Sequence, residues 1–161
     1  MTILGIDPGT ATTGFGIIKK LKIRGEKLKV IDYGCIKTAA NLSTAERLKR
    51  LSLELNLLIK KCKPDIVAVE DIFFFKNLKT AIKVSQARGV ILLTAAKSKC
   101  IIEEFTPLQV KQAVACYGRA DKTQVQKMVK TLLNLKQIPK SDDAADALAI
   151  AICCAHSIKG P

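Results

Sequence analysis

The first ten residues, MTILGIDPGT, constrain the fold more than any other stretch of the chain. A short apolar run at residues 3–6 is followed directly by Asp7 and closed by Pro8-Gly9. This pattern is typical of a buried strand with a tight turn after it, and it places one carboxylate at the end of a central strand. Aspartate also commonly begins turns, so Asp7 taken alone does not establish a catalytic role.

The same arrangement recurs in the middle of the chain. Pro64-Asp65 interrupts the sequence, residues 66–69 form another short apolar run, and Glu70 follows that run. Further strands are expected at residues 14–18, 28–36 and 101–102, with a turn at residues 25–26. Because short turns join the first three strands, an antiparallel meander is expected at the start of the chain.

Helical spacing of apolar residues predicts the rest of the secondary structure. The clearest case begins at Ser43, which forms a capping box with Glu46 ahead of leucines at 48, 51, 55 and 58. Gly89 lies inside the next helix, which predicts a close packing contact there, in the core or at a dimer interface. The remaining helices are expected at residues 80–97, 107–114, 125–135 and 141–158.

The last of these helices carries three acids. Ser141 can cap it, and Asp142 and Asp143 occupy its first turn, where negative charge complements the helix dipole. The dipole does not explain Asp146, which lies beyond the first turn and shares a face with Asp143. An acid among alanine, leucine and isoleucine needs a partner, so this helix is expected to present two functional carboxylates.

The chain is strongly basic: 27 Lys and Arg against 14 Asp and Glu give a net charge of +13. Such a charge on a compact domain favours a polyanionic partner such as nucleic acid. Lysine enrichment for solubility and an anionic membrane surface are the alternatives, but neither explains acids at the ends of apolar segments. With 161 residues, 48% of them hydrophobic, residues 1–161 are expected to form one domain.

The sequence has neither a secretion signal nor an apolar stretch long enough to span a membrane, so we expect a cytoplasmic protein without membrane association. The six cysteines form no CxxC pair and no zinc-like spacing with the single histidine, His156. They are expected to be reduced and mostly buried thiols.

Two segments are candidates for contact with nucleic acid. Residues 73–75 are three consecutive phenylalanines, for which a core role and stacking on an unpaired base are equally weighted. Residues 117–123, YGRADKT, are expected to form a basic loop that carries Arg119 and Lys122. Lys111 lies on the predicted helix just before this loop.

Four carboxylates at Asp7, Glu70, Asp143 and Asp146 would repel one another strongly if the fold brought them together. Oxygen ligands of this kind favour a hard cation, Mg²⁺ or Mn²⁺. Two such ions would activate a water and stabilise the leaving oxygen in phosphodiester cleavage. Spacing alone does not prove that the four acids converge.

Five motifs in order give the chain a resemblance to a known family. GIDPGTATTGFG, VEDIFFFKN, QARGV, VKQAVACYGRADKTQVQKMV and DAADALAIA together resemble the RuvC family of bacterial Holliday-junction resolvases. The resemblance covers nearly the whole chain. It implies an α/β protein with an RNase H-like fold, in which helices flank a mixed five-stranded sheet.

The resemblance also implies a function and a site. It implies a homodimer that makes paired nicks in a four-way DNA junction and works with a branch-migration motor of the RuvA and RuvB type. The metal-binding acids, serving two Mg²⁺ ions with Mn²⁺ as a possible substitute, would be Asp7, Glu70, Asp143 and Asp146. The junction-facing aromatic would be Phe73, and the phosphate contacts would be Lys111 and Lys122.

Two other functions remain open at this point. The chain could be an RNase H-like nuclease that acts on another substrate such as an RNA–DNA hybrid, or a binding module without catalysis. Two neighbouring acids depart from the pattern: strand alternation turns Asp71 away from Glu70, and Asp142 adjoins Asp143. Neither is assigned a metal.

Overall fold

The computed structural model of the chain describes residues 1–22, 26–71 and 78–158. The strands are β1 (Thr2–Asp7), β2 (Thr12–Lys22), β3 (Glu26–Lys37), β4 (Ile66–Glu70) and β5 (Ile101–Phe105). The helices are α1 (Thr44–Cys62), α2 (Leu78–Lys97), α3 (Pro107–Ala115), α4 (Lys122–Leu132) and α5 (Asp142–Ser157).

The strands form one mixed sheet in the order β3-β2-β1-β4-β5, which confirms the predicted architecture. β1 pairs antiparallel with β2, and β2 with β3, whereas β1–β4 and β4–β5 are parallel. In the parallel pairing Ile6 lies opposite Val69, so the next residues, Asp7 and Glu70, end neighbouring strands at the same edge of the sheet.

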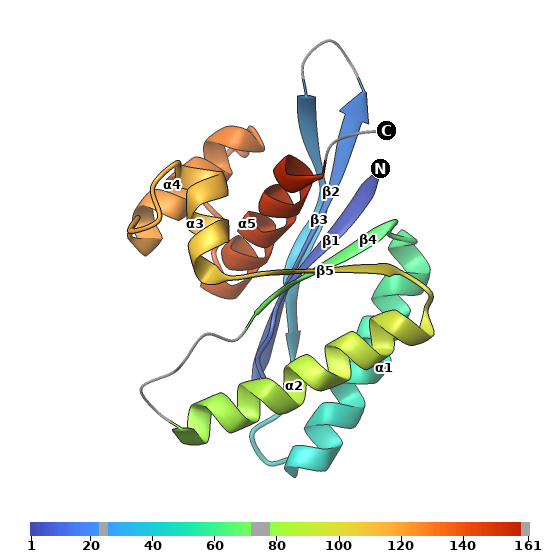
Figure 1. The fold of residues 1–161 in the computed structure, drawn as a ribbon. Helices are drawn as coiled ribbons and strands as arrows, with labels where there is room; N and C mark the ends of the chain where they lie inside the picture. The colour runs from blue at the N-terminus through green and yellow to red at the C-terminus, as the bar shows by residue number, and fades with distance from the viewer. Residues whose placement is uncertain (23–25, 72–77, 159–161) are drawn as a thin grey trace.

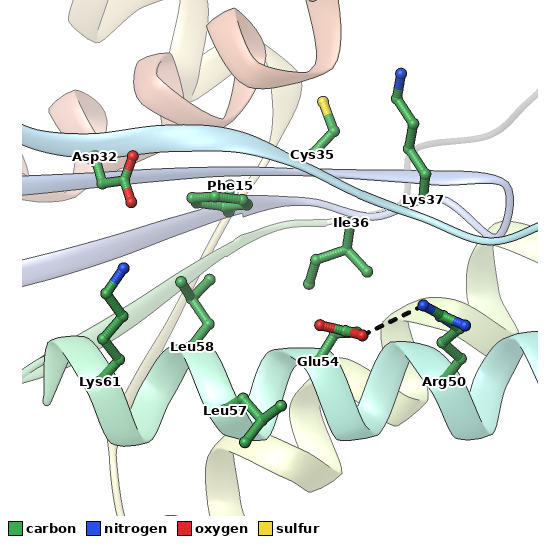
Figure 2. Close-up of a pocket in the computed structure, with 10 residues that line it drawn as sticks. All are labelled: Phe15, Asp32, Cys35, Ile36, Lys37, Arg50, Glu54, Leu57, Leu58 and Lys61. Atoms are coloured by element: carbon green, nitrogen blue, oxygen red, sulfur yellow. Dashed lines mark ion pairs between the residues drawn. The ribbon is translucent and has the colours of Figure 1, made fainter.

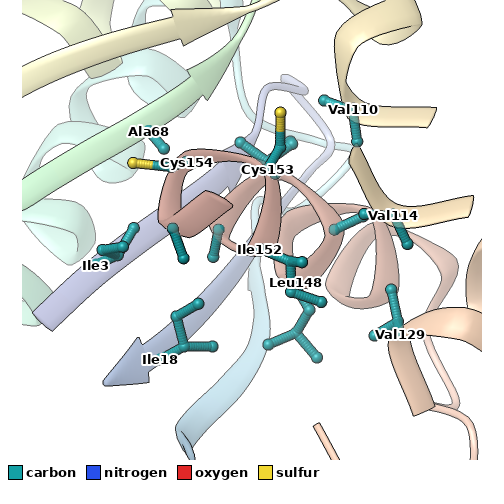
Figure 3. Packing of buried hydrophobic residues seen from close by; sticks show 14 of the residues in the cluster. Ile3, Ile18, Ala68, Val110, Val114, Val129, Leu148, Ile152, Cys153 and Cys154 are labelled. Atoms are coloured by element: carbon teal, nitrogen blue, oxygen red, sulfur yellow. The ribbon is translucent and has the colours of Figure 1, made fainter. Parts of the chain in front are cut away.

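Helices cover both faces of the sheet: α1 and α2 lie on one face, and α3, α4 and α5 on the other (Figure 1). Each face has its own buried apolar cluster, because successive strand residues point to opposite sides. Figure 3 shows Ile3 and Ile18 of the sheet on one side of α5, with Val110, Val114 and Val129 of α3 and α4 on the other.

Two strand glycines allow α5 to lie directly on the backbone of β1 and β2. A Cβ at Gly14 would lie 2.0 Å from the carbonyl oxygen of Asp143, and one at Gly5 would lie 2.2 Å from that of Ala147. No larger residue fits at either position unless the helix moves. This close approach brings the acidic N-terminal turns of α5 beside the end of β1.

The start of α4 differs from its prediction. The helix expected at residues 125–135 begins at Lys122 and ends at Leu132. Asp121 caps it and forms a capping box with Gln124, a signal that lies ahead of the first apolar residue and that the apolar spacing misses. Lys122 therefore stands in the first turn of a helix and not in a loop.

The cysteine prediction needs correction, and of the two contacts expected at Gly89 the one in the core is absent from the described chain. All six cysteines are free thiols, but only Cys153 and Cys154 are buried, and Cys116 is exposed. The other three lie at an edge strand or at the ends of elements, where packing is incomplete. Gly89 has no atom within 4 Å of where a Cβ would stand, so it makes no close contact within the described chain.

None of the helices in the described part of the chain is both long enough and apolar enough to cross a membrane.

Candidate active site

The charged residues at the end of β1 and β4 are electrostatically coupled. Burial, followed by repulsion from Glu70, Asp146 and Asp143, raises the pKa of Asp7 to about 8. Asp7 itself is half-buried at the edge of the sheet. The structure therefore brings the other three predicted carboxylates within electrostatic reach of Asp7, although the four come from three different elements.

Glu70 experiences the same environment. Burial and the nearby charge of Asp146 raise its pKa to about 7, while Lys111 on α3 opposes the shift. Burial also raises the pKa of Asp146, and Lys122 opposes that shift. Carboxylates with raised pKa values in a cleft are typical of functional sites that take up a cation or a proton.

Lys122 lies directly against these acids. Its Nζ is 3.2 Å from Asp146 Oδ2 and 3.3 Å from Asp142 Oδ2. Asp142 also accepts a hydrogen bond of 2.9 Å from Gln126, and it is exposed. Asp142 is thus held by Lys122 and Gln126 of α4 at an exposed position. Asp143 and Asp146, by contrast, contribute to the negative charge around Asp7.

A cavity of about 250 Å³ contains part of this group. Glu70 and Asp146 line it together with Lys111 and Lys122, over a floor that includes Val110. Acids and cations therefore share one hollow, as expected for a site that holds both a metal ion and a phosphate.

A larger hollow of about 450 Å³ lies elsewhere, between β3 and α1 (Figure 2). Figure 2 shows Leu58 pointing from α1 toward Phe15 on the sheet, with the Arg50–Glu54 ion pair at the rim. None of the four coupled carboxylates lines this hollow. Its size alone does not make it the site of the chemistry.

Arg88, which was not predicted as a site residue, fixes the end of β4. Its Nε donates to the carbonyl oxygen of Glu70 at 3.3 Å, and its guanidinium pairs with Asp71 at 3.0 Å and with Glu104. Asp71 thus has an ion-pair partner in Arg88. The available sequence signal was the QARGV motif, which contains Arg88.

A second unpredicted contact supports Asp143. The Ser141 hydroxyl lies 3.4 Å from Asp143 Oδ2, to which it donates, and 3.0 Å from the Cys35 thiol. Ser141 occupies the N-cap position of α5, but its side chain makes no capping hydrogen bond, contrary to the sequence prediction. Its hydroxyl instead lies between edge strand β3 and Asp143.

The donor set matches a hard cation, because it consists of carboxylate oxygens alone. Within residues 1–22, 26–71 and 78–158, however, no three acid, Cys or His side chains stand close enough to enclose an ion as they are placed. The fold therefore assembles the acids at one edge without closing a coordination shell around them.

The predicted DNA contacts have different outcomes. Lys111 and Lys122 lie in the cavity with the acids, and Arg119 is exposed on the segment between α3 and α4. Phe73 and its neighbours at residues 74–75 fall outside the described residues.

The comparisons with known proteins agree with this geometry. Residues 3–154 match the family described as Crossover junction endodeoxyribonuclease RuvC. A protein of that name from Alkaliphilus metalliredigens is 58% identical over 98% of this chain and 94% of its own length. One from Halothermothrix orenii is 56% identical over 99% and 94%.

Solved structures give the same result. A Thermus thermophilus RuvC structure superposes with a TM-score of 0.89 and 33% identity, covering 98% of this chain and 95% of the other. The same protein in complex with a Holliday junction substrate gives a TM-score of 0.87 at 31% identity, with the same coverage. The fold is therefore RNase H-like, as expected, and the chain belongs to the RuvC family of crossover junction endodeoxyribonucleases.

Proposed function

We propose that this chain resolves four-way DNA junctions by Mg²⁺-dependent hydrolysis of phosphodiester bonds. The observation that carries the proposal is the coupling of Asp7, at the end of β1, to Glu70 of β4 and to two acids of α5. Two lysines lie beside these acids, on a protein with a net charge of +13. Relatives that share more than half of their residues with this chain carry the corresponding name.

The acids would hold the metal. Asp7, Glu70, Asp143 and Asp146 would together hold two Mg²⁺ ions, with Asp7 electrostatically coupled to the other three acids. When bound, Mg²⁺ supplies an activated water and stabilises the leaving oxygen, and Mn²⁺ is a chemically similar substitute. Burial and mutual repulsion disfavour the negative charge of these carboxylates in the protein alone. A bound cation would offset that charge, so both effects favour metal binding.

The lysines would position the DNA. Lys111 and Lys122 face the same cavity as Glu70 and Asp146, so each can contact a phosphate oxygen next to the metal site. In the protein alone, Lys122 compensates the charge of Asp146. Arg119 would add an exposed phosphate contact, and Phe73 would stack on an unpaired base at the junction centre.

A homodimer would present two such sites to one junction. The outer face of α2 supports this inference: Ile82 and Leu93 are 52% and 55% exposed, and Gly89 between them has open space around it. Gly89 follows Ile82 by seven residues and Leu93 follows Gly89 by four. All three therefore lie on one face of α2, as at the interface between paired helices. The partner of the RuvA and RuvB type remains a prediction from the family.

Cleavage of a synthetic four-way junction tests the proposal. We expect Mg²⁺-dependent nicks in the junction and none in a linear duplex of the same sequence, with EDTA abolishing the activity. Asp7→Asn should retain junction binding and lose cleavage. Preferential cleavage of an RNA–DNA hybrid would indicate a different nuclease, and tight junction binding without cleavage in Mg²⁺ or Mn²⁺ would indicate a binding module.

A further inference from the structure

A polar hollow of about 230 Å³ lies outside the carboxylate site, and we refer to it as the Arg47 pocket. Three separate segments form it: the turn after β1, the connection from β3 into α1, and the first turns of α2. Its lining residues are Thr10, Ala40, Leu42, Thr44, Arg47 and Lys83. No acid lines it.

The two cations of the Arg47 pocket lack a counter-charge. Of the ion pairs seen in the described part of the chain, none involves Arg47 or Lys83. Glu46, the acid next to Arg47 in sequence, is engaged by Ser43 in the capping box of α1. Two unpaired cations that converge from different helices on a polar hollow favour an anionic ligand.

Neutral donors accompany the cations. Thr10 and Thr44, which each carry a hydroxyl, line the same hollow. The capping box of α1 uses the N–H groups of Ser43 and Glu46, so the N–H of Thr44, in the first turn between them, has no partner within the helix. The residues that line the Arg47 pocket provide hydrogen-bond donors and positive charge together. The oxygens of a phosphate group are negatively charged acceptors, so they match both features.

The turn that carries Thr10 is held in place. Its carbonyl oxygen accepts a hydrogen bond of 2.6 Å from the Thr38 hydroxyl, and the carbonyl of Ala11 accepts one of 3.0 Å from the Thr38 N–H. On its other side, the Thr13 hydroxyl donates to the carbonyl of Gly9 at 2.6 Å. The backbone on this side of the hollow is therefore already ordered before a ligand binds.

The Arg47 pocket adjoins the carboxylate site. Thr10 follows Asp7 by three residues, so the two lie within about 11 Å of each other. The two cations of the hollow come from α1 and α2, whereas Lys111, Lys122 and Asp146 of the other cavity come from α3, α4 and α5. These two groups of helices cover opposite faces of the sheet (Figure 1). A strand that crosses the end of β1 would pass both.

We propose that the Arg47 pocket binds a second, non-scissile backbone phosphate of the DNA strand whose neighbouring phosphate is cleaved at the carboxylates. Arg47 and Lys83 supply the charge, and Thr10 and Thr44 supply neutral donors. The inference rests on the proposed nuclease function and assigns that function a substrate subsite. Two phosphates held on opposite sides of β1 fix the direction of the strand across the site.

The first test compares charge-matched variants in an Asp7→Asn background, where junction binding is measured without cleavage. Arg47→Gln with Lys83→Gln is expected to weaken binding about tenfold and to reduce the slope of log K against log salt by about 0.9, the value for one phosphate contact. Lys60→Gln with Lys61→Gln removes the same charge about 20 Å further along α1 and should change affinity less than twofold.

The second test locates the contact. Junctions with a single neutral methylphosphonate at successive positions around the cut are titrated with the Asp7→Asn protein. One non-scissile position should weaken binding, and the same substitution should have no further effect on the Arg47→Gln, Lys83→Gln variant, because the contact is already lost. Melting curves of the variants should match those of the parent, since neither side chain makes an ion pair.

Three outcomes would overturn the inference. One is a pair of Arg47 and Lys83 substitutions that behaves like the Lys60 and Lys61 control. Another is a methylphosphonate series with no position that depends on Arg47. The last is an increase in protein stability with inorganic phosphate that requires Arg47, combined with no effect of any methylphosphonate position. That result would indicate a site for a small anion. Failure of the nuclease function itself would show separately, as absence of cleavage by the unmodified protein.

Discussion

At the scale of the residue, the site is a set of carboxylates in an unfavourable environment. The pKa of Asp7 rises to about 8 and that of Glu70 to about 7, chiefly because both side chains are partly buried and because acids surround them. The folded protein without metal therefore holds these groups in the charged form less readily than the unfolded chain does.

This difference predicts how stability depends on pH. Between pH 4 and 8 the unfolded chain ionises Asp7 while the folded protein still holds its proton, so the metal-free protein should lose stability as pH rises through this range. Asp7→Asn removes the effect, and its Tm in EDTA should exceed that of the parent increasingly toward pH 8. Equal Tm values at pH 8, measured by thermal melts, would contradict the electrostatic account.

A second prediction concerns the Ser141 hydroxyl, which donates to Asp143 and does not cap α5. Ser141→Ala should raise the Mg²⁺ concentration for half-maximal cleavage about tenfold, because support for a metal ligand is lost. It should also weaken direct Mn²⁺ binding, measured by electron paramagnetic resonance.

The control for this prediction is Cys35→Ser, which retains a hydroxyl partner for Ser141. It should leave metal affinity near that of the parent, and the Tm of Ser141→Ala should change little. Unchanged Mn²⁺ binding in Ser141→Ala would show that the hydroxyl does not position Asp143.

At the scale of the element, the position of α5 determines whether the acids meet. The helix lies on β1 and β2 because strand glycines leave room for its backbone. Its N-terminal turns then carry Asp143 and Asp146 beside the end of β1, where Arg88 holds the carbonyl of Glu70 from the other side.

Gly14→Ala tests this packing. The added Cβ would stand 2.0 Å from the carbonyl oxygen of Asp143, so α5 must shift, which should lower the free energy of unfolding by about 3 kcal/mol and reduce cleavage. Gly34→Ala is the matched control, because its Cβ meets only the Phe15 ring, at 3.0 Å, and that ring can move. Similar urea denaturation curves for the two variants would contradict the packing argument.

The sequence predicts the elements better than the contacts between them. An apolar run ended by an acid is a local pattern, so the strand positions of Asp7 and Glu70 could be predicted, and helical spacing put Asp143 and Asp146 on one face. The contact between Lys122 and Asp146 depends on how α4 packs against α5, which periodicity does not encode. The support of Asp143 from Ser141 and Cys35 likewise joins residues 106 positions apart.

At the scale of the whole molecule, the described chain is asymmetric. The acids, their lysines and the Arg47 pocket all adjoin the end of β1, whereas the exposed apolar residues of α2 form a separate face. On the proposed function, we expect two copies joined through the exposed Ile82 and Leu93 of α2 to present two carboxylate sites to one junction.

The most direct test is cleavage of a supercoiled plasmid that extrudes a cruciform. The parent protein with Mg²⁺ should convert it to linear DNA, because two nicks fall within one binding event. A control plasmid that lacks the inverted repeat, and so forms no cruciform, should remain uncut. Leu93→Glu, which places a charge on the exposed face of α2, should remain folded, sediment as a monomer and yield nicked circles. Equal nicking of both plasmids by the parent protein would contradict the account.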